Sequence, residues 1–276
     1  MTDEGSRKRE ESLRVFSQAA TIYDRIGPGI FSHFGQRLVD IAEIAAGANV
    51  LDVAAGRGAL LFPAAAKVGS TGHVTGIDFS PDMVRETAKD IESQKLHHVE
   101  IRPMDAEQMD FPAASFDWAL CGFALWMFTQ PSRVLQEFHR VLRGGGRVAL
   151  STWAANNQTW FNEVLRPYLP ALALKAAVSK DDLKFDTPSQ LETALRESGF
   201  SDVEIRAEEK DFVYASEEHF WQSLWSTGIR RQLEKMTPAG LEQAKSDVFQ
   251  NLQAMKKTDG FHKLNHALLA FGTKPA

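Results

Sequence analysis

The chain has 276 residues, of which 43% are hydrophobic and 24% charged, with a formal net charge of −5. This composition is that of a soluble globular protein, and the negative charge argues against an electrostatic surface for nucleic acid. No apolar run follows the charged first twelve residues, so we expect no signal peptide, no membrane span and a cytoplasmic protein with a small-molecule partner. The single cysteine, Cys121, excludes an internal disulfide and a cysteine-based zinc site.

The N-terminal part of the chain carries two helical patterns. Apolar residues recur at helical spacing over residues 13–23, until Gly27-Pro28-Gly29 interrupts the pattern. The charged residues before this stretch are expected to be frayed. A second pattern covers residues 31–44, so we predict that residues 10–46 form a helical lid ahead of the first strand.

Beyond residue 47, short apolar runs alternate with helical patterns. We expect strands at residues 49–53, 73–77, 99–102, 116–121 and 147–152, helices at 59–68, 80–91 and 132–142, and a glycine turn at 144–146. The helix that begins at Ser80 has a side-chain cap, a proline at its first position and an acid near its positive end. Strands separated by helices of this length predict a parallel, doubly wound sheet.

The second half of the chain contains two insertions. Residues 155–185 offer no strand pattern and residues 215–260 are helical and polar, whereas strands are expected at 203–214 and 264–271. Ligands of open α/β sheets bind outside the carboxyl ends of the strands, where these insertions would cover a substrate. We therefore expect a single domain, residues 1–276, with a Rossmann-like α/β core around a mostly parallel seven-stranded sheet and with helical lid insertions. The core comprises residues 47–154, 186–214 and 261–274, and the lid comprises residues 10–46, 155–185 and 215–260.

The most informative motif lies where the first strand ends. Residues 52–58 read Asp-Val-Ala-Ala-Gly-Arg-Gly, and Asp78 closes the next strand. A strand that passes through a glycine loop into a helix commonly binds phosphate, because free backbone N–H groups face the ligand. A carboxylate such as that of Asp52 would repel a pyrophosphate but attract an ammonium group. The loop therefore favours a zwitterionic ligand that also carries a ribose.

Four further segments agree with this loop in order and spacing. They are residues 76–83, 104–107, 115–120 and 141–147. With them, nearly the whole chain resembles a class I S-adenosylmethionine-dependent methyltransferase of the ubiquinone/menaquinone-biosynthesis and natural-product type (methyltransferase type 11/25). The resemblance implies S-adenosyl-L-methionine as the cofactor. It also implies in-line transfer of the methyl group to oxygen, nitrogen or carbon of a small, partly apolar or aromatic metabolite.

The resemblance distributes residues over the parts of the cofactor. It implies that Asp52 holds the ammonium group, that Asp78 accepts both ribose hydroxyls and that Asp105 accepts the adenine amine. Gly56 and Gly58 would let the backbone approach the methionine part. The remaining implied residues are Ala54 in the loop, Phe79, Met83, Met104 and Ala106 around the base, Cys121 beside the sulfonium through its backbone, and Tyr23 as a closing tyrosine.

Three loop positions bear on the alternatives. Ala54 stands where the family commonly has its first glycine, and Arg57 receives no role. Leu61 replaces the third glycine of the dinucleotide fingerprint, which disfavours a nicotinamide-dependent reductase. A non-methylating enzyme on the same scaffold, such as a cyclase that retains bound S-adenosylmethionine, stays open, because no residue separates it from a methyltransferase.

The acceptor site is less well marked. Trp126, Trp153 and Trp160 either line an aromatic pocket or simply pack the lid. If the acceptor needs a base, Tyr23 and His33 are the candidates. No cluster of histidines, cysteines or acids has metal-ligand spacing, so we expect no metal. We expect no nucleic-acid and no membrane partner, and a homo-oligomer remains compatible with the sequence.

Overall fold

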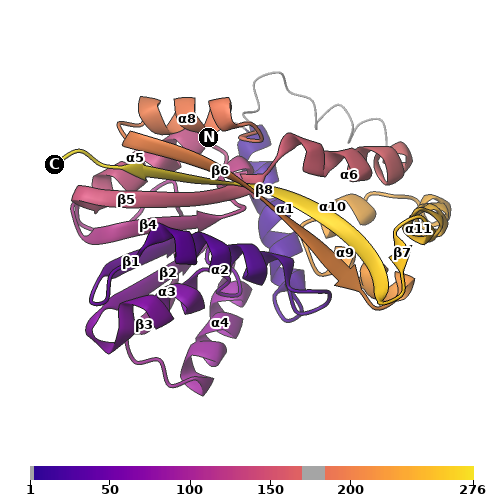
Figure 1. Ribbon diagram of the computed structural model, residues 1–276, viewed down its shortest axis with the longest axis horizontal. Coiled ribbons are helices and arrows are strands. Elements are labelled where there is room, and N and C mark those ends of the chain that lie inside the picture. Colours follow the sequence, from indigo (N-terminus) through magenta and orange to yellow (C-terminus); the bar gives the residue numbers. More distant parts are fainter. Residues whose placement is uncertain (1–2, 170–183) are drawn as a thin grey trace.

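The computed structural model describes residues 3–169 and 184–276, so part of the second lid segment, residues 170–183, lies outside the described residues. The centre of the fold is a sheet with strand order β3-β2-β1-β4-β5-β8-β6 (Figure 1). The strands are β1 (Asn49–Val53), β2 (His73–Asp78), β3 (Val99–Pro103), β4 (Phe116–Gly122), β5 (Leu142–Trp153), β6 (Ser201–Tyr214) and β8 (Gly260–Thr273), with a two-residue β7 (Lys256–Lys257) paired to β8. Strands β1 to β5 are parallel and β8 is antiparallel to both neighbours, which confirms the mostly parallel Rossmann-like sheet.

Helices cover both faces of this sheet, and further helices form the lid beside it. They are α1 (Asp3–Ala19), α2 (Ile30–Ala42), α3 (Leu61–Val68), α4 (Pro81–Ser93), α5 (Pro131–Val141), α6 (Thr159–Val164), α8 (Pro188–Glu197), α9 (Glu217–Trp225), α10 (Arg230–Leu233) and α11 (Pro238–Gln253). Successive strand residues point to opposite faces, so Leu51 joins the apolar core under α5 and α8, and Val50 joins the core under α2 and α3 (Figure 1). None of the described helices is long and apolar enough to cross a membrane.

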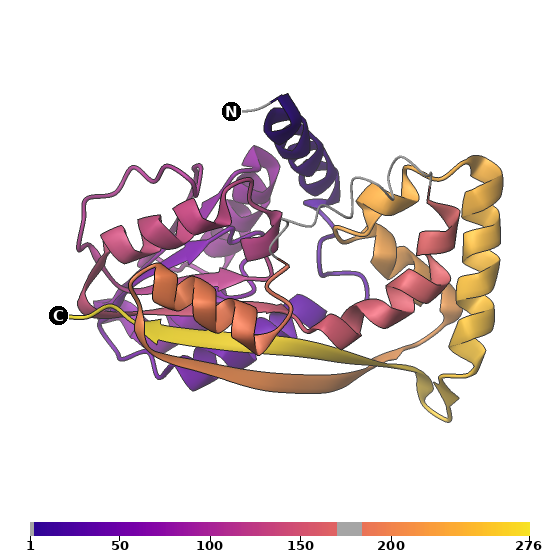
Figure 2. The ribbon, with the colours of Figure 1, turned by 90° about the horizontal axis from the view of Figure 1, so that it is seen from above.

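The strands β6 and β8 form a ribbon that carries part of the lid. Each has 14 residues, and their far halves run past the other strands towards α9, α10 and α11 (Figure 2). One face of the ribbon buries Phe212, Tyr214 and Phe261 against the lid helices, whereas Leu264 on the other face is exposed. Because only alternate residues are buried there, the sequence pattern did not reveal that β8 begins at Gly260 rather than at residue 264.

The N-terminal helix also differs from the prediction. α1 begins at Asp3, with no frayed charged start, and it ends at Ala19, before Tyr23 is reached. Its charged side chains form tertiary contacts, such as the 2.7 Å ion pair between Arg14 and Glu234 just after α10. Contacts with distant parts of the chain hold this helix in place. The sequence shows only a dense run of charged residues, from which these contacts could not be predicted.

The glycine turn at residues 144–146 lies within β5 and not ahead of it. The pairing of β4 with β5 shifts register between Phe116 and Trp118, which accommodates the turn. The N–H of Gly145 donates to the carbonyl of Lys274 at 2.9 Å, so the residues that follow β8 close the turn. A glycine is suited to this position because its φ is +77°.

Candidate active site

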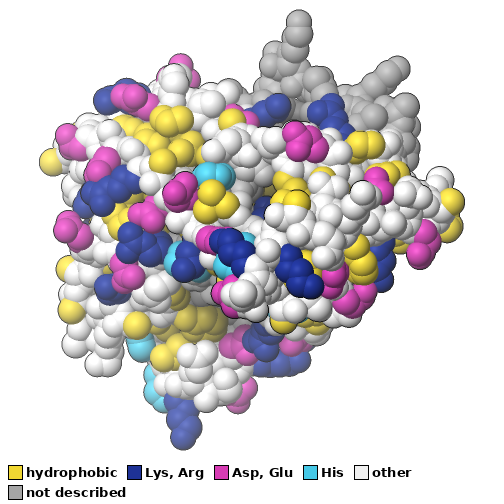
Figure 3. Space-filling view, turned by 45° about the vertical axis from the view of Figure 1, so that its right-hand side comes forward, with side chains coloured by type: hydrophobic (Ala, Val, Ile, Leu, Met, Phe, Trp, Pro, Cys, Tyr) yellow, Lys and Arg dark blue, Asp and Glu magenta, His cyan; other side chains and the backbone are white. Residues whose placement is uncertain are grey.

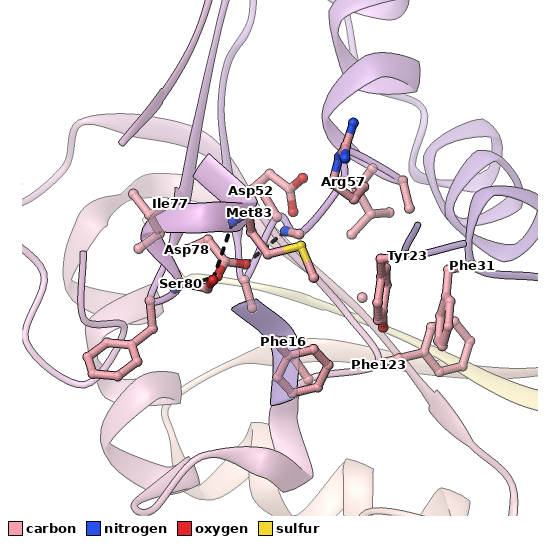
Figure 4. A pocket seen from close by; sticks show the side chains of 18 of the residues that line it. Phe16, Tyr23, Phe31, Asp52, Arg57, Ile77, Asp78, Ser80, Met83 and Phe123 are labelled. Carbon is pink, nitrogen blue, oxygen red and sulfur yellow. Dashed lines mark hydrogen bonds between the residues drawn. The ribbon is translucent and has the colours of Figure 1, made fainter. Parts of the chain in front are cut away.

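A cavity of about 420 Å³ lies at the carboxyl ends of β1, β2 and β4, bounded by α1 and the segment that follows it (Figure 4). Residues from the N-terminal lid meet there with residues from the ends of β1, β2 and β4 and from the segment that follows β3. The predicted cofactor residues that line the cavity are Tyr23, Asp52, Ala54, Gly56, Asp78, Phe79, Met83, Met104, Asp105 and Ala106. Two predicted residues, Gly58 and Cys121, do not line it.

Asp52 is a buried carboxylate without a hydrogen-bond partner. Its side chain is 1% exposed, and neither oxygen has a partner among the described residues. Burial raises the pKa of Asp52 well above its usual range, and the nearby charge of Asp78 raises it further, whereas the backbone N–H of Leu61, which forms no hydrogen bond of normal geometry with the carboxylate, acts weakly in the opposite direction. An unpaired carboxylate is costly to bury, and a ligand ammonium group would offset that cost. Asp52 therefore fits the group that the sequence assigned to it.

Asp78 is held in place by the backbone. One carboxylate oxygen accepts the N–H of Gly56 at 2.8 Å, and the other accepts the N–H of Ser80 at 2.8 Å. Burial raises the pKa of Asp78, while these two N–H groups act in the opposite direction. A carboxylate has about four acceptor positions, so lone pairs remain for two ribose hydroxyls. Asp78 thus fixes the glycine loop and can still bind a diol.

The loop between these acids requires unusual backbone angles. Ala54, at the position of the missing glycine, has a φ of +56°, a left-handed conformation that costs an alanine about 1–2 kcal/mol. Gly58 has a φ of +81°, and a Cβ there would lie 2.4 Å from the ring of Phe62. Gly58 thus makes room for the turn into α3, and, unlike Gly56, it does not line the cavity.

Asp105 is not free in the structure. Its carboxylate forms an ion pair with Arg9 of α1, and it also accepts the N–H of Glu107 at 2.9 Å. The guanidinium of Arg9 lies 4.9 Å from the ring centre of Phe79, which is 43% exposed. Arg9 therefore contacts both groups that the sequence assigned to adenine. This contact could not be predicted from the sequence, because 96 positions separate Arg9 from Asp105.

Phenylalanines, and not tryptophans, form the aromatic wall of the cavity. Tyr23 stacks on Phe31 with ring centres 5.3 Å apart, and Phe16 and Phe123 extend the wall at 5.9 Å from Tyr23 and 5.5 Å from Phe31 (Figure 4). Phe128 also lines the cavity. The 18 phenylalanines of the chain follow no distinctive spacing, so the sequence did not single these out.

The three tryptophans proposed for the acceptor lie elsewhere. Trp153 stands behind Phe123, with ring centres 4.2 Å apart. Trp126 is 40% exposed, and Trp160 packs edge-on against Phe220 at 5.3 Å. None of the three lines the cavity. Trp153 and Trp160 pack against other aromatic rings, and Trp126 lies at the surface.

The two candidate bases, Tyr23 and His33, differ in their position and in the shift of their pKa. Burial raises the pKa of Tyr23, and the charges of Asp24 and Asp78 raise it further, which disfavours proton removal by its phenolate. His33 lies outside the cavity lining, with its ring 5.5 Å from that of Phe212. Burial, followed by the charges of Lys210 and Arg37, lowers the pKa of His33.

Two further points complete the site. The side chain of Cys121 is buried in the core under α5, so Gly122 and Phe123 line the cavity in its place. Within the described part of the chain, no three histidines, cysteines or acids are grouped so that they could hold a metal ion.

The chain is similar in sequence to known methyltransferases. A methyltransferase domain family matches residues 50–146. Aklanonic acid methyltransferase DauC of Streptomyces sp. (strain C5) is 40% identical over 144 residues, which are 52% of this chain and 66% of that protein. Nocamycin O-methyltransferase of Saccharothrix syringae is 31% identical over 87% of this chain and 90% of its own length. Demethylmenaquinone methyltransferase of Listeria welshimeri is 30% identical over 71% of this chain and 90% of its own.

Solved structures share the fold at lower identity. BH2331 of Bacillus halodurans C-125 aligns with a TM-score of 0.60 and 23% identity, over 87% of this chain and 98% of its own. The [4+2]-cyclase SpnF aligns at 0.54 and 23%, over 87% and 82%. Phosphoethanolamine N-methyltransferase 2 of Haemonchus contortus, in complex with S-adenosyl-L-methionine, aligns at 0.58 and 19%, over 94% and 57%. The sheet, the acids of the cavity and the relatives agree: the chain belongs to the class I S-adenosylmethionine-dependent methyltransferases that act on small molecules.

Proposed function

We propose that the enzyme methylates an acidic oxygen, a carboxylate or an enolate, of a small and partly aromatic metabolite. The cavity carries this proposal, because one of its sides is a wall of aromatic rings that includes Tyr23, Phe31 and Phe123. Of the two candidate bases, His33 does not line it and Tyr23 has a raised pKa. An acceptor that arrives deprotonated needs no base from the protein. The relative named nocamycin O-methyltransferase supports oxygen as the acceptor atom, and the relative named for aklanonic acid supports an acidic acceptor.

In this mechanism the residues bind and align, and they perform little acid–base chemistry. When bound, S-adenosylmethionine supplies a methyl group that its sulfonium has already activated. Asp52 and Asp78 hold the ammonium and the ribose, which fixes the position of the sulfur. Tyr23, Phe31 and Phe123 exclude water and present an apolar, aromatic surface to the acceptor. The aromatic wall thus selects the acceptor while the acids select the donor.

A mass-spectrometric screen with S-adenosylmethionine labelled in its methyl group tests this proposal. Matched pairs of aromatic carboxylic acids and their amides, and of enols and their methyl ethers, serve as acceptors. We expect labelled O-methyl products from the acids or enols, formed one-to-one with S-adenosylhomocysteine, and none from the blocked partners. Labelled N- or C-methyl products would contradict the choice of oxygen. Conversion of a substrate without S-adenosylhomocysteine would instead support the cyclase alternative.

The setting of the reaction is part of the same proposal. Relatives named for aklanonic acid and nocamycin support a role in secondary metabolism. We propose a cytoplasmic enzyme of one domain with a small-molecule partner and without nucleic-acid or membrane partners. Size-exclusion chromatography with light scattering would give its oligomeric state.

The contact between Arg9 and Asp105 leads to a prediction about cofactor affinity. Adenine binding at Asp105 and Phe79 must compete with the guanidinium of Arg9. A partly exposed ion pair is worth about 0.2–1 kcal/mol, so Arg9→Ala should tighten S-adenosylhomocysteine binding by about 1.4- to 5-fold in calorimetric titration. Arg14→Ala removes another ion pair of the same helix, outside the cavity lining, and should leave the affinity unchanged. Weaker binding in Arg9→Ala would show that Arg9 assists adenine binding.

A further inference from the structure

Arg57, to which the sequence assigned no role, is a buried cation in the wall of the cavity. Its side chain is 6% exposed. One terminal nitrogen pairs with Asp90, and the other donates to the carbonyl of Ala20 at 2.5 Å. The third nitrogen, Nε, is buried and has no hydrogen-bond partner among the described residues. The guanidinium is thus held firmly by two of its nitrogens while the N–H of the third is unused.

The cavity therefore contains two unsatisfied groups of opposite polarity from one loop. Asp52 supplies a carboxylate without a partner, and Arg57 supplies a cationic donor without one (Figure 4). The two side chains form no ion pair with each other. Leaving both groups unpaired in a buried site is costly, and a ligand with an anion and a cation close together would satisfy both.

We propose that Arg57 binds the α-carboxylate of the methionine part of the cofactor, while Asp52 binds its ammonium group. The assignment rests on the proposed use of S-adenosylmethionine and adds a residue that selects for the amino-acid end of that molecule. An arginine suits a carboxylate, because its charge-assisted N–H bonds are short and directional. Ligands that lack the carboxylate lose this bond and leave the N–H unpaired.

Two neighbours act as positioning groups for Arg57. Asp90 of α4 binds Arg57 and also Arg25, whose side chain is 54% exposed. Burial favours a higher pKa for Asp90, but the bonds from Arg57 and Arg25 hold it below its usual range, so Asp90 stays ionised at neutral pH. The carbonyl of Ala20 belongs to the segment that leads to Tyr23, so Arg57 also ties the glycine loop to the lid.

A purely structural Arg57 would make the same contacts with Asp90 and Ala20, so the test must separate the two roles. Decarboxylated S-adenosylmethionine keeps the ammonium, the sulfonium, the ribose and the adenine, and lacks only the carboxylate. We would titrate this compound and S-adenosylmethionine by calorimetry into the wild type and into Arg57→Gln. The wild type should prefer S-adenosylmethionine by about 10- to 100-fold, the usual strength of a charge-assisted hydrogen bond.

In Arg57→Gln the preference should disappear, because S-adenosylmethionine binds more weakly while the decarboxylated compound binds as before. Arg57→Lys keeps the charge and should retain part of the preference, and it replaces Arg57→Gln if thermal unfolding shows that the latter does not fold. Arg25→Gln removes the other partner of Asp90 and should keep the full preference. If Arg57→Gln bound both ligands more weakly by the same factor, the role of Arg57 would be structural only. Equal binding of both by the wild type would overturn the carboxylate site, and binding of neither would instead refute the use of this cofactor.

Discussion

Asp52→Asn is expected to make the ligand-free protein more stable and to remove most of its cofactor affinity. The carboxylate is buried without a partner, and an amide costs less to bury than an ionised acid. We expect a gain of about 1–3 kcal/mol in the free energy of unfolding at neutral pH, which corresponds to roughly 2–4 °C in Tm per kcal/mol for a chain of this size. Differential scanning calorimetry of the two ligand-free proteins would measure this gain in stability.

The pH dependence of this gain follows from the raised pKa of Asp52. Between the unfolded pKa, about 4, and the higher folded pKa, the folded protein binds more protons than the unfolded chain. The free energy of unfolding therefore falls as pH rises through this window, and the penalty persists above it. The difference in Tm between Asp52→Asn and the wild type should vanish near pH 4 and be fully developed above the folded pKa.

With the cofactor bound, the wild type should be more stable than Asp52→Asn, which is the reverse of the order without ligand. The ammonium group of S-adenosylhomocysteine pairs with Asp52 but not with an asparagine, so Asp52→Asn should bind it about 10- to 100-fold more weakly. Asp117→Asn is the matched control, because Asp117 accepts the N–H of Asn49 at 2.8 Å and pairs with Arg143 at the other end of the sheet. That variant should lose stability and keep its affinity. An Asp52→Asn protein that is less stable and binds normally would make Asp52 a structural residue.

The three acids assigned from the sequence have different environments in the folded protein. Asp52 forms no hydrogen bond of normal geometry among the described residues, Asp78 is held by two backbone N–H groups, and Asp105 is paired with Arg9. These differences follow from contacts and not from the motif, in which all three are acids at strand ends. Asp52 is therefore the acid with the most to gain from a cation, and Asp105 is the one for which a ligand must compete.

The features that could be predicted from the sequence are local, whereas those that could not be predicted depend on tertiary contacts. The loop after β1 and the cap of α4 could be predicted, because residues a few positions apart determine them; Ser80 accepts the N–H of Met83 as expected. The aromatic wall could not be, because Phe16, Phe31 and Phe123 come from three separate segments whose spacing carries no signal. For the same reason Arg57 could be located in the loop but not given a role until Asp90 and Ala20 were seen to fix it.

Asp78→Ala should lower affinity for the cofactor and loosen the loop that surrounds it. The carboxylate offers charge-assisted bonds to the ribose, so its loss should weaken S-adenosylhomocysteine binding by about 1.5–3 kcal/mol, or roughly 10- to 100-fold. Its oxygens also accept the N–H groups of Gly56 and Ser80. The variant should therefore unfold at a lower temperature than the wild type, the opposite of Asp52→Asn, and the amides of the loop should exchange hydrogen faster.

Comparison with a ligand that lacks the diol separates these two effects of Asp78→Ala. The 2′,3′-dideoxy analogue of S-adenosylhomocysteine cannot bond to Asp78, so it should lose only the smaller part of its affinity that depends on loop order. Asp82→Ala is the control, because Asp82 lies in the first turn of α4, pairs with Arg85 at 2.5 Å and does not line the cavity. It should leave both affinities unchanged. If Asp78→Ala weakened the analogue as much as the parent compound, Asp78 would act through the loop alone, and the ribose would have to lie elsewhere in the cavity.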